Sequence, residues 1–140
     1  MRLAITLLFL MAIAAPAHAV STPSHRLCNP DRIRQTNAWV DCLQNALDSA
    51  EEKLNAAAST IAAKMQAGDM LEEPTRTENR VLFETAQKQW LSVRDQGCKS
   101  YGAHRAGLGF GAVQFRLTCL LDETVFRVDA LKSRYADELN

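Results

Sequence analysis

The stretch from Glu84 to Cys98, ETAQKQWLSVRDQGC, brings together three kinds of side chain that could do chemistry. Trp90 offers an aromatic face, Arg94 and Asp95 form a charge pair, and Cys98 carries a thiol. Their spacing places them on successive turns of one helix. Such a strip could be a catalytic site, a metal site or a structural seam between helices.

Catalysis by this strip would need partners that the sequence does not supply. A nucleophile requires an adjacent base, and acid–base chemistry requires titratable groups held together in a cleft. The predicted helix around the strip carries no His, and Asp95 points to solvent on a helical wheel. The sequence has no GxSxG, HExxH or phosphate-binding glycine motif. We therefore predict a protein that is not an enzyme and needs no cofactor.

A structural role explains the strip better. Gln87 and Arg94 lie along one border of the apolar face of their helix, beside Trp90. An Arg side chain can lay its aliphatic stem on a core while its guanidinium meets a carboxylate or a carbonyl. On the preceding predicted helix, Glu51 and Asn55 occupy the matching border. We predict a seam in which Arg94 pairs with Glu51, with Asn55 or with a loop carbonyl.

The N-terminus has the features of an export signal. A positive residue follows the initiator Met, and the apolar run LAITLLFLMAIAA is too short to span a bilayer. Ala17-His18-Ala19 then has the small-x-small form of a cleavage site. We predict a signal peptide over residues 1–19 and a periplasmic or secreted bacterial protein. Leu27 precedes Cys28 where a lipid-attachment signal needs a small residue, so we expect no membrane anchor after cleavage.

The composition limits the partners. The chain has 140 residues, enough for one domain, with 16 Lys and Arg against 16 Asp and Glu. Nucleic-acid binding needs clustered Lys and Arg to neutralise phosphates, and the sequence shows no basic stripe. We expect no nucleic-acid partner.

All 4 cysteines follow the predicted leader, at Cys28, Cys42, Cys98 and Cys119. An even number in an exported chain favours two disulfides over a metal site, and no CxxC pattern is present. A Cys98–Cys119 bond would fold a glycine-rich segment over Phe115 and close a loop worth roughly 3 kcal/mol. Cys28–Cys42 is then the remaining pair, and it would attach an N-terminal arm, residues 20–28, to the first helix. Crossed pairings stay open, because three of the cysteines fall at one end of an antiparallel bundle.

Hydrophobic periodicity predicts three amphipathic helices. The first runs from Asn29-Pro30 to Gly68, the second from a capping box at Thr75 to about Gly97, and the third over about Ala112 to Glu138. Four glycines from Gly102 to Gly111 predict a flexible loop between the last two helices. The predicted fold is all-α: a small antiparallel three-helix bundle, stapled by two disulfides and formed by residues 29–140 as a single domain.

Two helix faces decide what this bundle exposes. On the second helix we expect the buried face to consist of Leu82, Phe83, Ala86, Trp90, Val93 and Gly97. On the third helix, Phe115 and Phe126 lie opposite the main apolar arc. Either the glycine loop covers these two rings or they form a contact surface.

The segments QTNAWVDC, KLN, QKQWLSVRDQGC and CLLDETVFRVDAL occur in an order and spacing that resemble the LprI family, the lysozyme inhibitor LprI N-terminal domain. The matching positions cover nearly the whole mature chain: Thr36, Trp39, Cys42, Leu54, Asn55, Gln87, Trp90, Arg94, Asp95, Cys98, Cys119, Thr124, Arg127 and Leu131. Glu51 and Ala58 depart from the family, which usually shows Asp and an aromatic there. The resemblance implies a small, exported, helical and disulfide-bonded protein, and it adds Thr124 and Arg127 to the seam.

The family's namesake inhibits lysozyme, so the resemblance implies a non-enzymatic protein that blocks a lysozyme-type muramidase. Such an inhibitor needs a rigid platform that presents a protruding element to a cleft with acidic catalytic groups. We expect the loop from Tyr101 to Gly111 to do so, with His104 or Arg105 meeting a catalytic carboxylate and Tyr101 packing at the rim. The alternative is a structural or envelope-interaction protein that uses the two phenylalanines of the third helix as its contact patch.

Overall fold

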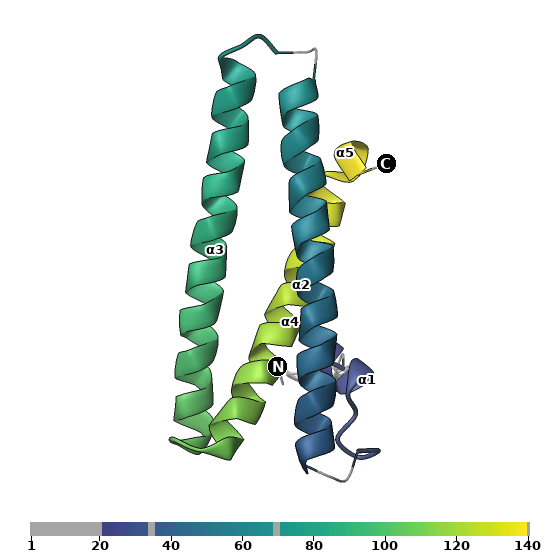
Figure 1. Cartoon of the computed structure of the whole chain (residues 1–140), viewed down its shortest axis with the longest axis vertical. Helices are drawn as coiled ribbons and strands as arrows, with labels where there is room; N and C mark the ends of the chain where they lie inside the picture. Colours follow the sequence, from purple (N-terminus) through teal and green to yellow (C-terminus); the bar gives the residue numbers. More distant parts are fainter. Residues whose placement is uncertain (1–20, 34–35, 69–70, 140) are drawn as a thin grey trace, which may run out of the picture.

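The computed structural model of the chain describes residues 21–33, 36–68 and 71–139 (Figure 1). Its elements are α1 (Pro23–Leu27), α2 (Thr36–Ala67), α3 (Thr75–Ala106), α4 (Phe110–Arg134) and α5 (Ala136–Leu139). No strand occurs in these ranges, and none of their helices combines the length and apolar character that crossing a bilayer requires. The predicted all-α fold with two disulfides is confirmed. The predicted signal peptide, residues 1–19, lies outside the described residues.

Three long helices form the body of the molecule. α2 and α3 run antiparallel, and α4 packs against both of them and runs back along α3 (Figure 1). α4 has 25 residues whereas α2 and α3 have 32 each, so the connected ends of α2 and α3 project beyond α4. We call this projecting part the hairpin end and the opposite part, where α3 turns into α4, the α3–α4 end.

Two clusters of buried side chains hold these helices together. The cluster towards the α3–α4 end consists of Cys28, Leu43, Leu47, Ala50, Cys98, Leu117, Leu120 and Leu121. The cluster towards the hairpin end consists of Leu54, Ile61, Phe83, Val128 and Leu131. Burial of each large apolar side chain stabilises the fold by roughly 1.5–3 kcal/mol. The buried residues of α2 and α4 recur at helical spacing, so in these two helices the apolar periodicity of the sequence indicates the buried face.

The first long helix starts later than predicted. Asn29 does not cap it. The side chain of Asn29 instead accepts the backbone N–H of Asp31 at 2.8 Å and closes a turn. The N-terminal arm forms α1, in which the backbone N–H and the hydroxyl of Ser24 donate to the Asp122 carboxylate of α4 at 2.7 and 3.0 Å. Trp39 Nε1 donates to the carbonyl of Cys28 at 2.8 Å, which fixes the arm on α2 as well.

The glycine-rich segment is mostly helical, so the predicted flexible loop was wrong. α3 continues to Ala106 and α4 begins at Phe110, which leaves only residues 107–109 as the connection. A Cβ on Gly102 would lie 2.6 Å from the carbonyl oxygen of Ala112, so this glycine lets α3 and α4 approach closely. Gly107 has a φ of 68°, the left-handed conformation that ends many helices.

α3 also buries a different face from the one predicted. Its buried residues are Phe83, Gln87, Arg94, Cys98 and Gly102. Leu82 and Val93, expected in the core, are 60% and 70% exposed. The bond from Cys98 to α4 and the close approach at Gly102 fix the rotation of α3 about its axis. That rotation turns Arg94 inward and Val93 outward.

Candidate functional site

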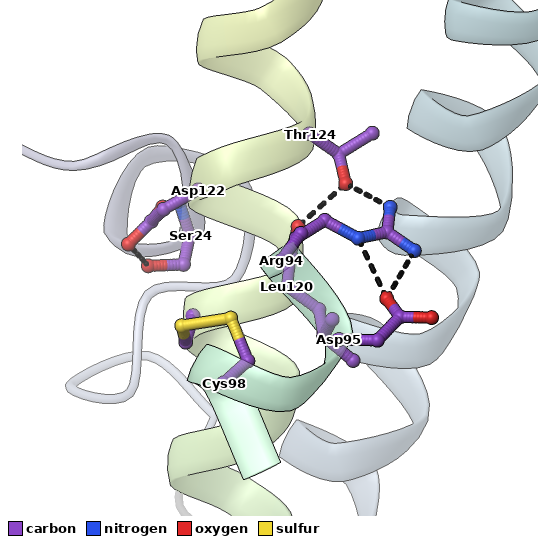
Figure 2. The surroundings of a disulfide bond; sticks show 8 residues. Ser24, Arg94, Asp95, Cys98, Leu120, Asp122 and Thr124 are labelled. Carbon is purple, nitrogen blue, oxygen red and sulfur yellow. Dashed lines mark hydrogen bonds and ion pairs between the residues drawn. A yellow bond between two sulfur atoms is a disulfide. The ribbon is translucent and has the colours of Figure 1, made fainter. Parts of the chain in front are cut away.

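The two favoured disulfide pairings are both present. Cys28 and Cys42 are joined with Cα atoms 5.8 Å apart, and Cys98 and Cys119 with Cα atoms 5.5 Å apart. These bonds use all the cysteines of the described residues, so no thiol there is left to ligate a metal. The first bond ties the N-terminal arm to α2, and the second joins α3 to α4 beside Arg94 (Figure 2).

Arg94 lies at the centre of the seam, and its guanidinium is bonded at all of its nitrogens. Nη2 lies 2.9 Å from Glu51 Oε1 and 2.7 Å from Asp95 Oδ1, and Nε donates to the same Asp95 oxygen at 2.9 Å. Nη1 donates to Thr124 Oγ1 at 2.8 Å, and that hydroxyl donates to the carbonyl of Leu120 at 2.6 Å (Figure 2). The Arg94 side chain is only 6% exposed. One buried cation therefore joins α2, α3 and α4.

Trp90 contacts a second cation as well. The Cζ atoms of Arg94 and Arg127 lie 5.5 and 5.4 Å from the centre of the Trp90 ring, within the range of a cation–π interaction. Arg127 Nε donates to Gln87 Oε1 at 3.0 Å, and Nη2 donates to the same oxygen. Burial lowers the pKa of the Arg127 guanidinium, and the charge of Arg134 lowers it further.

This network connects helices, and its geometry does not suit acid–base chemistry. A guanidinium stays protonated and only donates, and each nitrogen of Arg94 already contacts a protein oxygen. Asp95 is exposed to solvent, as expected, and its carboxylate also binds Arg94. Asn55, also assigned to the seam, is exposed and lines a small pocket with Glu51 and Arg94. Within the three described ranges, no group of three or more His, Cys, Asp or Glu is placed to hold a metal ion.

The residues predicted to bind a partner lie on the last turns of α3 and not in a loop. The Tyr101 and Phe115 rings meet edge to face with centroids 6.2 Å apart, and Arg105 Cζ lies 5.1 Å from the centre of the Phe115 ring. His104 is exposed beside them. Phe115 is thus half-buried under the end of α3, whereas Phe126 remains 53% exposed.

The turn between α3 and α4 contains a feature that the sequence reading missed. Leu108 is 99% exposed, and Phe110 next to it is half-exposed. We call residues 107–110 the apex. The signal that could have found it is the single leucine between two glycines, in the sequence GLGF, because such a leucine has no neighbouring side chains to cover it.

A separate groove lies at the hairpin end. It has a volume of about 610 Å³ and is lined mainly by α2, α3 and the C-terminal residues. Leu82, Phe83 and Tyr135 supply apolar surface, and the Phe83 and Tyr135 rings meet edge to face at 5.5 Å. We call it the hairpin-end groove.

The fold and these contacts define a class: small, all-helical, disulfide-bonded domains whose helices meet around a buried arginine. The family model described as lysozyme inhibitor LprI matches residues 28–131, which is more than half of the chain. The chain belongs to this family, so the resemblance found in the sequence is confirmed. The matched segment spans both disulfides and the seam. Comparisons with curated proteins and with solved structures give no match.

Proposed function

We propose that the protein is an exported, non-enzymatic inhibitor of lysozyme-type muramidases that acts in the bacterial periplasm or outside the cell. The observation that carries this proposal is the match to the lysozyme inhibitor LprI family over residues 28–131. The predicted signal peptide supports export. The two disulfides support it too, because such bonds persist in oxidising compartments.

A stiff scaffold suits this function. An inhibitor acts by occupying its enzyme, and a preorganised surface loses less conformational entropy when it binds. The Cys98–Cys119 bond braces the α3–α4 end, and the bonds of Arg94 tie the three long helices together behind it. Cys98 and Arg94 are buried, so these braces leave the outer surface of the α3–α4 end free for a partner.

We place the binding surface at the α3–α4 end. Muramidases cleave a glycosidic bond with a pair of carboxyl groups that flank it in a cleft. Arg105 and His104 offer groups that can donate to such carboxyls, and Tyr101 offers an aromatic rim. The ring of Phe115 holds the Arg105 guanidinium in place, so its position is partly fixed before binding.

Loss of lysozyme activity tests the proposal directly. Oxidised protein comprising residues 20–140 is titrated against a lysozyme, and two rates are followed. One is the clearing of a cell-wall suspension, and the other is the hydrolysis of a soluble chitooligosaccharide. We expect both rates to fall as the protein-to-enzyme ratio rises, because the protein acts on the enzyme.

The soluble substrate separates inhibition from wall coating, because a protein that only covers cell walls slows the clearing alone. The control is the same chain after reduction and alkylation, which removes both disulfides and should abolish the effect. Unchanged hydrolysis of the soluble substrate at micromolar protein would contradict the proposal for that lysozyme.

A second function is favoured by the exposed apolar side chains on another face. Val93 of α3 lines a shallow pocket with Trp90 and Glu123, and Phe126 lies one turn along α4 from Glu123. A surface of this kind suits an envelope-interaction protein that binds a second copy of itself. Light scattering over a range of concentrations tests this, and a monomer at every concentration rejects it.

A further inference from the structure

We infer that the apex, residues 107–110, enters the substrate cleft of the muramidase, with Leu108 as the side chain that becomes buried. This inference rests on the proposed function and names the part of the α3–α4 end that makes the decisive contact. In this arrangement, Tyr101 and Arg105 of α3 contact the enzyme around the apex.

The apex has the shape of a narrow projection. Leu108 lies between Gly107 and Gly109, and a Cβ built on either glycine would meet no other atom within 4 Å. The two residues that flank Leu108 therefore add no side chain to the tip, where the chain reverses between α3 and α4 at the end of the molecule (Figure 1). Leu108 is 99% exposed and contributes nothing to the core, so its apolar surface is free to be buried by a partner.

The base of the projection is held firmly. Cys98 and Cys119 link α3 to α4, and Gly102 lets the α4 backbone approach to a distance that no Cβ would permit. A Cβ on Gly111 would lie 3.0 Å from the Ala106 Cβ, so the two helices stay close up to the turn itself. A short connection between two linked helices keeps one position, and the entropy lost on entering a cleft is correspondingly small.

The ends of α3 and α4 that meet at the apex carry charges of one sign. Residues 96–121 contain no Asp or Glu, but they contain Lys99, Arg105 and Arg116. None of these three forms a salt bridge within the described part of the chain. Asp41 of α2 lines a groove with Arg116, so the positive charge of Lys99 and Arg105 is the least compensated. Positive charge beside an apolar tip is complementary to a cleft that contains two carboxyl groups.

The other apolar surfaces fit a cleft less well. The hairpin-end groove is concave, and its lining mixes Lys64 and Arg76 with Asp137 and Glu138. A concave surface cannot enter a cleft. The face around Val93 lies on the side of α3 and presents the wide surface of a helix pair. Among the described residues, only the apex combines a convex shape and an apolar tip with flanking segments of α3 and α4 whose charges are all positive.

The test compares matched changes at three exposed apolar residues. Leu108→Asp places a carboxylate at the tip, and Val93→Asp and Leu82→Asp place one at positions elsewhere on the surface that are 70% and 60% exposed. Each variant and the wild type are titrated against the lysozyme, with the soluble chitooligosaccharide as substrate. Circular dichroism and the thermal midpoint establish that each variant is folded, and Leu108→Ser serves as a second, uncharged change at the tip.

We expect Leu108→Asp to weaken inhibition at least about 30-fold, the loss found for a central anchor of an interface, and Leu108→Ser to weaken it in the same direction. Val93→Asp and Leu82→Asp should change it by less than about threefold, because rim and outlying residues contribute little. The wild-type protein should raise the KM of the lysozyme for the chitooligosaccharide and leave the kcat of the lysozyme unchanged, because occupation of the cleft excludes substrate.

Three results would overturn this inference. If the wild type inhibits and Leu108→Asp inhibits equally well, the apex is not the contact although the proposed function stands. If a change at Val93 or Leu82 has the larger effect, the contact lies on that surface. If the wild-type protein lowers the kcat of the lysozyme without raising its KM, the protein binds outside the cleft. A wild type without any inhibition would reject the proposed function itself.

Discussion

Nη1 of Arg94 donates a hydrogen bond of 2.8 Å to Oγ1 of Thr124, a residue 30 positions away on another helix. Thr124 has no exposed surface, so its hydroxyl cannot bond water. Its proton goes to the carbonyl of Leu120 on its own helix, and its lone pair accepts from Arg94. A buried polar group that is fully bonded stabilises a fold, but the same group left alone costs about 1–3 kcal/mol.

Removal of Arg94 should therefore destabilise the fold strongly. We expect Arg94→Ala to lower the free energy of unfolding by about 3 kcal/mol, because it removes the charged donor to the buried Thr124 oxygen, leaves two carboxylates without their partner and removes packing on Trp90. Glu51 and Asp95 are partly exposed and can rehydrate, which keeps the loss of stability below that of a fully buried pair.

Urea denaturation at equilibrium measures the change that Arg94→Ala causes, with Lys88→Ala on the exposed face of α3 as the control. A seam without structural importance would give the two variants equal midpoints.

Thr124→Val examines the same bond from its other side. Valine keeps the shape of threonine and removes the hydroxyl, so we expect the free energy of unfolding to fall by about 1–2 kcal/mol. Because the two residues share one hydrogen bond, the double variant should lose less stability than the sum of the single changes. Strict additivity would mean that the bond contributes nothing to stability.

Two glycines of α3 should respond in opposite directions to the same change. Gly102→Ala places a Cβ 2.6 Å from the Ala112 carbonyl oxygen, so α4 has to move. We expect the free energy of unfolding to fall by about 1–3 kcal/mol. Gly97→Ala meets no atom within 4 Å on the exposed side of the helix. It should raise stability by about 0.5–1 kcal/mol through helix propensity alone. Thermal unfolding of the pair measures both, and a shared sign would contradict the close approach of α3 and α4.

The rotation of α3 shows where sequence reasoning ends. The apolar residues of α2 and α4 repeat clearly, so their buried faces and the bundle itself were predictable. On α3 the apolar residues and the Gln87–Arg94–Cys98 border compete for the core, and periodicity favoured the apolar residues. The border is buried because Cys98 and Gly102 make contacts with α4, and such contacts between distant residues are not visible in local spacing. The pairing of Arg94 with Glu51 followed from matching borders, whereas the partner Thr124 depended on this rotation.

The apex was missed for a related reason. Four glycines within ten residues are typical of a flexible loop, and that reading treated them as equivalent. In the structure these glycines have different roles, since Gly102 permits close contact between α3 and α4 and Gly107 ends α3. What remains between the helices is so short that Leu108 has nothing to pack against. The exposure of Leu108 depends on the residues at which α3 ends and α4 begins, and helix boundaries are the features that sequence patterns predict least accurately.

The two disulfides should differ in their importance for inhibition. Replacing Cys98 and Cys119 by Ala should cost roughly 3 kcal/mol and should also loosen the base of the apex, so inhibition should weaken in protein that is still folded. Replacing Cys28 and Cys42 by Ala removes a bond between cysteines that are 14 positions apart at the N-terminal arm, compared with 21 for the other pair. It should cost similar stability with little effect on inhibition. Unfolding midpoints and inhibition titrations of the two variants separate these effects, and equal loss of inhibition would show that the brace at the apex is unimportant.

The contacts of Glu73 at the hairpin end predict a pH dependence of stability. The Thr77 hydroxyl donates to Glu73 Oε2 at 2.8 Å, and this bond, with smaller contributions from Gln66 and Arg76, lowers the pKa of Glu73 below its ordinary value of 4.5. A carboxyl group whose pKa is lower in the folded state stabilises that state above the unfolded pKa, and it loses this effect as the pH falls through the folded pKa. Glu73→Gln should therefore lower the thermal midpoint slightly near pH 7, and the difference from the wild type should disappear as the pH falls below 4.5 and through the folded pKa. Glu72→Gln is the matched control, because it removes the same charge without removing the Thr77 bond. A difference between Glu73→Gln and the wild type that is as large in acid as at neutral pH would mean that the Thr77 bond does not act through the ionised carboxylate.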